Sequence, residues 1–155
     1  AYETLSEPMQ RLLQDVRTWN VGDRKRLGRT HEITATRDGR YVGNATMAAK
    51  VKDPGELITE SIHPLVRTHP DTGRKALYLS NHTQTLDGFK PEEAEPILAY
   101  LADHAVEPEF TCRFRWEVGS LAIWDNRCTQ HRALNDYPGK RRRMHRITIA
   151  GDTPY

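Results

Sequence analysis

The sequence contains little cysteine, and this scarcity limits the kinds of protein it can encode. Only Cys112 and Cys128 occur among 155 residues, and neither belongs to a Cys-x-x-Cys pair. A small disulfide-rich domain and a zinc ribbon both need more cysteines at characteristic spacings, so both classes are excluded. Two thiols without a pairing pattern fit a reducing compartment, and we therefore expect a cytoplasmic protein.

Long hydrophobic runs and an excess of one charge are also absent. No apolar run approaches the roughly 18 residues that a membrane-spanning helix needs, so we expect no membrane partner. Lys and Arg number 23 against 21 Asp and Glu, which leaves a formal net charge of +2 and no overall field to attract nucleic acid. The sequence also lacks a glycine-rich phosphate loop and a Ser-His-Asp signature.

The chain length suits a single domain. Its 155 residues, 37% of them hydrophobic, are enough for one core but too few for two ordinary domains. The low apolar content predicts a globular unit with long polar loops. The chain begins at Ala1, beside a helical pattern and without an initiator Met, so we expect a fragment of a longer protein.

Two segments have helical periodicity. Residues 5–16 contain a possible N-cap at Ser6, with Pro8 in the first turn of the helix, and residues 90–105 have Pro91 and acidic residues near their start. Both segments repeat apolar residues at the spacing of one helix face. These residues are Leu5, Met9, Leu12, Leu13 and Val16 in the first segment, and Ala94, Ile97, Leu98, Leu101 and Ala105 in the second.

Strand signals occupy much of the remaining chain. Residues 61–80 predict two strands joined by a Pro-Asp-Thr-Gly turn, and residues 110–126 predict two short strands around 117–119. Residues 141–151 alternate β-branched side chains and end in glycine, which favours another strand. Residues 20–55 mix charge and glycine, so we expect a mobile loop or lid there, with a short hairpin turned at Asp38-Gly39. The fold class is thus strand-rich with flanking helices.

The arginines near the C-terminus allow two interpretations. One is a solvated basic face, which is common for such clusters. The other follows from strand alternation, which sends Arg142 and Arg146 to one face and Arg141 and Arg143 to the opposite face. At about 3.3 Å per residue, Arg142 and Arg146 would lie roughly 13 Å apart. They would then hold two separate anions at the two ends of a pocket.

His131 is a candidate metal ligand, although a lone histidine is often structural. An Fe(II) site that activates oxygen typically uses two histidines and one carboxylate. The sequence "HPD" at 69–71 is a His-x-Asp that would complete such a site together with His131, but it falls on the predicted hairpin tip. We expect its side chains to be solvated and loosely held there, so we assign it no metal-binding role.

Several segments together resemble one family. "WDNRCTQHRALNDYPGKRRRMHRITIAGDTP" is similar to the C-terminal motif of the taurine dioxygenase family, the Fe(II)- and 2-oxoglutarate-dependent oxygenases of sulfonates and alkyl sulfates. Its arginines follow the histidine by eleven and fifteen residues. "AYETLSEPMQRLL", "HPLVRTHPDTGRKALYLS" and "FRWEVGSLAIWDN" resemble further family segments in the same order. The likeness covers nearly the whole chain and is poorest at 20–55.

The resemblance implies a role for each matching residue. His131 would bind Fe(II), Arg142 the remote carboxylate of 2-oxoglutarate, and Arg146 the acidic group of the substrate, with Trp124 and Trp116 near the metal. The family uses O2 to oxidise a substrate C–H and releases succinate and CO2. Hydroxylation beside a sulfonate or sulfate ester then yields an aldehyde plus sulfite or sulfate. The implied fold is a double-stranded β-helix, or jelly roll, and the implied intact protein is a homo-oligomer.

One departure from the family pattern limits this expectation. Family members carry a His-x-Asp pair upstream of the segment resembling "AYETLSEP", where this chain begins. We therefore expect residues 1–155 to form the C-terminal part of a single dioxygenase domain, with an incomplete jelly roll, and the isolated chain to be inactive. Two alternatives remain open: a noncatalytic remnant that binds a dicarboxylate, and a basic module that binds nucleic acid through "KRRRMHR".

Overall fold

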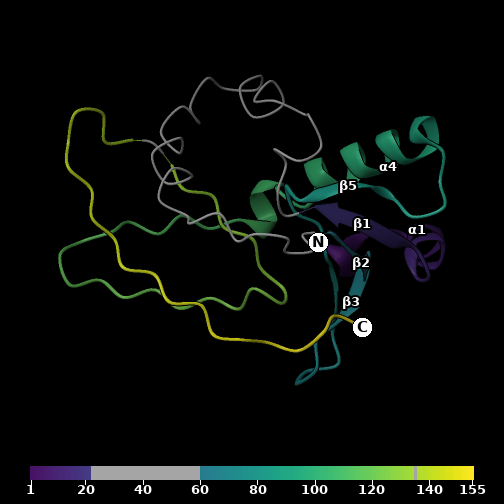
Figure 1. Cartoon of the computed structure of the whole chain (residues 1–155), viewed down its shortest axis with the longest axis horizontal. Coiled ribbons are helices and arrows are strands. Elements are labelled where there is room, and N and C mark those ends of the chain that lie inside the picture. Colours follow the sequence, from purple (N-terminus) through teal and green to yellow (C-terminus); the bar gives the residue numbers. More distant parts are fainter. Residues whose placement is uncertain (22–59, 135) are drawn as a thin grey trace. The chain divides into compact units, whose positions relative to one another are not determined.

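A computed structural model describes residues 1–21, 60–134 and 136–155 (Figure 1). The chain divides into two compact units, one of residues 1–20, 61–131 and 152–155 and the other of residues 21–60 and 132–151. The expected loop at 20–55, with its hairpin at 38–39, falls almost entirely outside the described residues. No helix in the described part is long and apolar enough to cross a membrane.

The N-terminal segment forms a short helix that leads directly into a strand. After a 3-10 turn, η1 (Tyr2–Thr4), the helix α1 (Glu7–Leu13) starts behind Ser6, whose backbone is extended as an N-cap requires. This confirms the predicted helix, although it ends three residues before the expected Val16. A turn closed by Val16 N–H donating to Leu13 O (3.2 Å) redirects the chain into β1 (Arg17–Val21), which the sequence analysis did not predict.

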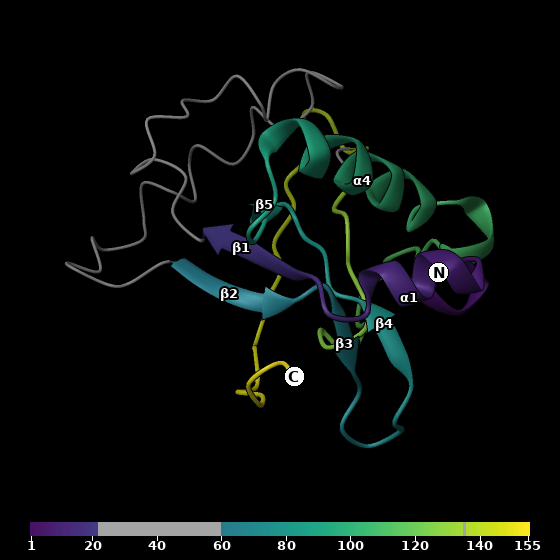
Figure 2. The same cartoon turned by 90° about the vertical axis from the view of Figure 1, so that its right-hand side faces the viewer.

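Strand β1 is the middle of a small sheet. Its neighbours are β2 (Glu60–Pro64) on one side and β5 (Thr83–Leu86), antiparallel, on the other (Figure 2). The register between β1 and β5 shifts at Trp19/Asn20, and the Asn20 side chain bonds across it. Asn20 Nδ2 donates to Thr18 Oγ1 (2.9 Å), and Asn20 Oδ1 accepts from Thr83 Oγ1 (2.8 Å). These bonds satisfy polar groups that are removed from water.

The predicted hairpin at 61–80 is confirmed, with different strand limits. β3 (Val66–Thr68) pairs antiparallel with β4 (Lys75–Leu77), and the connecting turn contains Gly73 at φ +68°, where a side chain would be strained. The guanidinium of Arg67, 3% exposed, pairs with Asp152 (2.8 Å) and lies over the ring of Tyr78. Thr68 N–H donates to Tyr155 O (3.0 Å), so residues 152–155 lie against β3.

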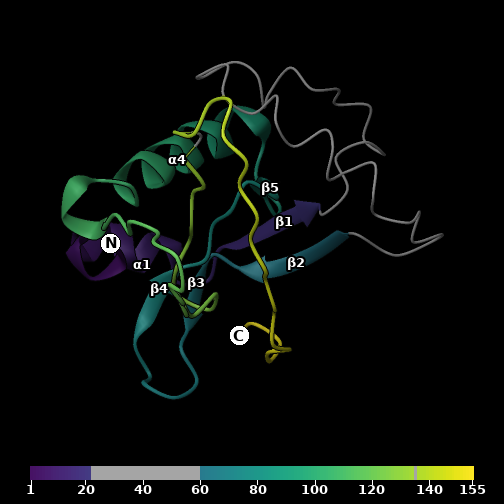
Figure 3. The ribbon, with the colours of Figure 1, turned by 90° about the vertical axis from the view of Figure 1, so that its left-hand side faces the viewer.

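The second predicted helix is also confirmed. α4 (Pro91–His104) packs against β5 and buries Ala94 and Leu101 (Figure 3). At its C-terminal end, His104 Nε2 lies 3.0 Å from Ala1 O, which joins the helix to the start of the chain. The core shared by the helices and strands consists of Leu5, Leu13, Val16, Leu65, Val66, Leu79, Leu86, Ala94 and Leu101.

The strands predicted after the 3-10 turn η4 (Pro108–Phe110) are wrong. A turn does occur at 117–120, where Ser120 N–H donates to Glu117 O (3.1 Å), but the segments beside it are not strands. Residues 141–149 form no strand either, because no backbone hydrogen bond joins them to another described residue. Alternation favours a strand, but a strand also needs a neighbouring backbone to pair with. The expected alternation, with Arg142 and Arg146 on one face of a strand and Arg141 and Arg143 on the other, is therefore absent in this segment.

Candidate functional site

Asp125 organises the segment that leads to His131. Its backbone carbonyl accepts hydrogen bonds from Cys128 N–H (3.3 Å) and Thr129 N–H (3.0 Å). Its side-chain Oδ1 accepts from Arg127 N–H (2.8 Å), so the carboxylate closes the turn that its own carbonyl begins. This Asx-type turn gives residues 125–129 a defined shape without any strand pairing.

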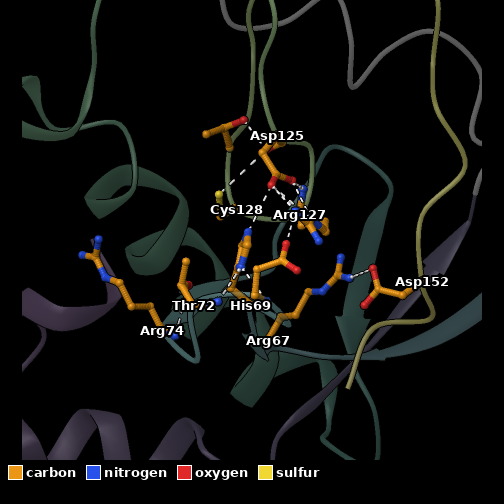
Figure 4. A network of polar contacts seen from close by, with 10 residues as sticks. Arg67, His69, Thr72, Arg74, Asp125, Arg127, Cys128 and Asp152 are labelled. Carbon is orange, nitrogen blue, oxygen red and sulfur yellow. Dashed lines mark hydrogen bonds and ion pairs between the residues drawn. The ribbon is translucent and has the colours of Figure 1, made fainter.

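The Asp125 carboxylate is surrounded by donors (Figure 4). Arg127 Nε lies 3.0 Å from both carboxylate oxygens, and Arg127 Nη2 lies 2.7 Å from Oδ2. His69 Nε2 lies 3.0 Å from the same Oδ2. Hydrogen bonds from the Arg127 side chain, then from its backbone N–H, and then from His69 hold the pKa of Asp125 well below its usual range. The same partnership raises the pKa of Arg127.

His69 is fixed in one tautomer by its two ring nitrogens. Its Nδ1 accepts from the backbone N–H groups of Asp71 and Thr72, both at 3.3 Å, so Nδ1 carries no proton. The proton is therefore on Nε2, which donates to Asp125. The His69 side chain is only 11% exposed.

The expectation of a loosely held "HPD" is thus wrong for His69. The hairpin turn itself is where it was predicted, but it folds against the 125–127 segment. Asp71 adds a second contact, because its Oδ2 lies 2.8 Å from Arg127 Nη2. The partner of His69 is 56 residues away in sequence, and local turn signals carry no information about a contact at that separation.

One cluster of potential metal ligands occurs in the described ranges. The ligand atoms of His69, Asp125 and Cys128 all lie within 4.8 Å of one another. Arg127 donates to both Asp125 oxygens, however, so the carboxylate is already satisfied and a guanidinium occupies the place where a cation would bind. Charge repulsion makes this cluster a poor metal site.

His131 is exposed and belongs to no such cluster within residues 60–134. Its ring lies 4.9 Å from the ring of Trp124, at an interplanar angle of 45°, so these two predicted site residues lie together. Trp116, the other predicted aromatic, contacts Phe114 edge-on at 4.9 Å. An imidazole suits Fe(II), but among the described residues His131 is in no group of three potential ligands, so these residues alone do not complete an iron site.

The arginine segment belongs to the second unit and is described separately. The chain turns at 137–140, where Lys140 N–H donates to Tyr137 O (3.0 Å). The guanidinium of Arg142 lies 5.3 Å from the centre of the Tyr137 ring, a cation–π contact that leaves its donors available to an anion. Arg146 is exposed.

His69, Asp125 and Arg127 form a functional candidate that the sequence analysis did not select. All three were within quoted segments, "HPD" and "WDNR", and one signal pointed to them. Asp125 follows an apolar run, and an aspartate side chain favours a turn because it accepts a hydrogen bond from the backbone two residues on.

Comparison with known proteins defines the class of the chain. Residues 1–148 match the family described as "Taurine catabolism dioxygenase TauD, TfdA family". The chain therefore belongs to the TauD/TfdA dioxygenase family, which confirms the resemblance.

Individual relatives agree with this assignment. The chain is 33% identical over 154 residues to the alpha-ketoglutarate-dependent sulfate ester dioxygenase of Pseudomonas putida, which covers 99% of this chain and 48% of that enzyme. It is 42% identical over 93 residues to the alkylsulfatase of Acinetobacter baylyi, covering 60% of this chain and 29% of that protein. The crystal structure of a taurine dioxygenase from Burkholderia xenovorans superposes with a TM-score of 0.58 at 32% identity, covering 81% of this chain and 35% of that chain. The chain thus spans less than half the length of these proteins.

Proposed function

We propose that the protein in its full natural length is an Fe(II)- and 2-oxoglutarate-dependent dioxygenase of small organic acids. The carrying observation is the family match over residues 1–148, together with relatives named as a sulfate ester dioxygenase and an alkylsulfatase. The products would be succinate, CO2 and an aldehyde, plus sulfate from a sulfate ester or sulfite from a sulfonate such as taurine. The proposed binding partner is an acidic small molecule, and we expect no binding to nucleic acid.

His131 is the proposed iron ligand of this chain. Its imidazole is exposed and stands beside Trp124, and a ligand needs an accessible nitrogen. The remaining family ligands, a histidine and a carboxylate, are not beside His131 in the described residues. When bound, Fe(II) and 2-oxoglutarate would activate O2 for oxidation of the substrate C–H. Trp124 and Trp116 are proposed to line the region near the metal.

Arg142 and Arg146 are the proposed anion-binding residues. The guanidinium of Arg142 would hold the remote carboxylate of 2-oxoglutarate by a charge-assisted pair of hydrogen bonds. Arg146 would hold the sulfate, sulfonate or carboxylate of the substrate and so direct the reacting carbon toward the iron. Both side chains are exposed, and neither forms an ion pair with another described residue, so their donors are available to an anion.

The proposal also covers the fold, the assembly and the location of the intact protein. The fold would be a double-stranded β-helix, in which residues 1–155 form the C-terminal part of one dioxygenase domain. The intact protein would be a cytoplasmic homo-oligomer. The 155-residue chain alone would bind iron weakly and would not turn over.

A succinate assay with matched arginine variants tests the proposal. The full-length protein, with Fe(II), 2-oxoglutarate and either taurine or hexyl sulfate, should release succinate only when the acid is present. Arg142→Ala should raise the KM for 2-oxoglutarate at least 10-fold, because a charged pair contributes about 1.5–3 kcal/mol. Arg143→Ala, the neighbouring control, should leave that KM within 2-fold of the wild-type value. An equal rise in both variants would contradict the assignment of Arg142.

A further inference from the structure

The segment from Asp125 to His131 is attached to the β3–β4 hairpin and to Leu79, which follows the hairpin. Figure 4 shows the contact between His69 of the hairpin and Asp125. His69 donates to Asp125 at 3.0 Å, and Asp71 pairs with Arg127 at 2.8 Å. A third contact lies immediately before His131, where the Gln130 amide nitrogen donates to Leu79 O. The segment is thus attached near its start and at its end.

These contacts matter because nothing regular holds the segment. Residues 111–134 contain no helix or strand, so no backbone ladder fixes their position. Side-chain contacts therefore decide where the segment lies. His131 follows Gln130 directly, and consecutive Cα atoms are about 3.8 Å apart, so the position of Gln130 limits that of His131.

His69 is the most buried member of this network. Its side chain is 11% exposed, against 33% for Asp125 and 31% for Arg127. Both of its ring nitrogens form hydrogen bonds: Nδ1 accepts from backbone N–H groups of its own turn, and Nε2 donates to Asp125. It therefore transmits the position of the hairpin, which is anchored to the core through β3 and β4, to the 125–131 segment.

We propose that His69 is a positioning residue, which acts through Asp125 to place His131 for metal binding. This inference rests on the proposed function, because it assumes that His131 is an iron ligand. His69 itself does not contact the metal in this account. Its task resembles that of the outer groups that orient ligands in metal sites, where loss of such a group typically weakens metal affinity 10- to 100-fold.

The test compares substitutions on one hairpin in the full-length protein. His69→Ala removes the contact to Asp125, whereas His69→Gln keeps an N–H donor at the place of Nε2. Arg74→Ala is the matched control, because Arg74 is on the same hairpin but its side chain pairs with Glu3, in an exposed ion pair (2.6 Å). Two quantities are measured: the dissociation constant of Mn(II), a redox-inert probe for Fe(II), and amide hydrogen exchange in peptides from 124–131 and from α4.

The proposal predicts a graded result. His69→Ala should weaken Mn(II) binding about 10-fold or more and speed exchange in 124–131 about 10-fold, with α4 unchanged. His69→Gln should recover most of both properties, and Arg74→Ala should match the wild type. Recovery by glutamine also separates loss of positioning from failure to fold.

Three outcomes would overturn the inference. Faster exchange in His69→Ala with Mn(II) affinity within 2-fold of the wild type would show that the contact does not serve the metal site. Equal losses in His69→Ala and Arg74→Ala would show a general effect of the hairpin. Absence of Mn(II) binding by the wild type would instead overturn the proposed iron site and, with it, the role of His69.

Discussion

Residues up to Phe110 and residues after it are held in different ways. The earlier region supplies every residue of the hydrophobic core, from Leu5 to Leu101, and all the described helices and strands. The described residues of the later region form no helix or strand, and many of their large apolar side chains are exposed. Ile147 and Ile149, for example, are 91% and 88% exposed.

This difference shows that apolar alternation is not sufficient for a strand. Residues 145–151 have strand-like composition, but no other described residue pairs with their backbone, and their isoleucine side chains are exposed. The proposed site residues nevertheless fall in the later region. Their positions depend on side-chain contacts such as His69–Asp125 and on the turn closed by Asp125.

The largest predicted contrast concerns leucines. Leu101→Ala should lower the free energy of unfolding by about 2–5 kcal/mol, because this side chain is fully buried and its loss leaves a cavity. Leu121→Ala, in the later region, should change it by less than about 0.5 kcal/mol, because Leu121 is 80% exposed. Urea denaturation measures both values. Similar losses in the two variants would remove the distinction between the regions.

A smaller contrast concerns asparagines. Asn20→Ala should lower the free energy of unfolding by about 1–3 kcal/mol, because it removes the hydrogen bonds that the buried Asn20 side chain makes to the hydroxyl groups of Thr18 and Thr83. Asn126→Ala removes only an exposed bond from Trp124 Nε1 (2.9 Å), so its cost should stay below about 0.5 kcal/mol. The same denaturation experiment checks this pair, and a larger loss in Asn126→Ala would contradict the account.

Acid should loosen the later region before the core unfolds. Hydrogen bonds from Arg127 and Arg67 lower the folded-state pKa of Asp125 and Asp152 respectively. Because each folded pKa is below the unfolded value of about 3.9, the stabilisation is complete above that pH and is lost as the pH falls below it.

Fluorescence of a Trp19→Phe variant isolates this transition, because the two remaining tryptophans, Trp116 and Trp124, lie in the later region. Their signal should change below about pH 4, before the far-ultraviolet circular dichroism of the helices changes. A single shared transition would show that the two regions are not held separately.

The weakest predicted effect lies in the early region, at His63 on β2. Burial, then the charges of Arg67 and Arg17, lower its pKa below the usual 6.5. The folded protein therefore disfavours the protonated form, so His63 contributes stability above about pH 6.5 that is lost as the pH falls. In the His63→Gln variant, the urea concentration at the unfolding midpoint should depend less on pH between pH 7 and 5.5 than it does in the wild type. A wild-type midpoint that is already flat there would contradict this prediction.

Local signals in the sequence account for much of the early region. Ser6 at the N-cap position, the acidic start of α4 and the Pro-Asp-Thr-Gly turn are signals within a few residues. Each predicted an element that the structure contains, although the Ser6 side chain makes no capping hydrogen bond. β1 and β5 were missed because they are short and half polar, and their stability comes from pairing with each other.

The site was less predictable, for a related reason. His131, Arg142 and Arg146 were selected through the family motif, whose family assignment is confirmed, while their roles stay predictions. His69 was rejected because a hairpin tip is usually solvated, but its partner Asp125 is 56 residues away. Contacts at such separations depend on the folded topology and leave no periodic trace in the sequence.

Isotope labelling tests the central claim most directly. The full-length protein is supplied with Fe(II), 2-oxoglutarate, an alkyl sulfate and ¹⁸O₂, and the succinate is analysed by mass spectrometry. A dioxygenase of this kind places one atom of O2 in succinate and the other in the hydroxylated substrate, so the account predicts succinate with one ¹⁸O and an equal amount of sulfate. Succinate without label, or none above a protein-free control, would contradict it.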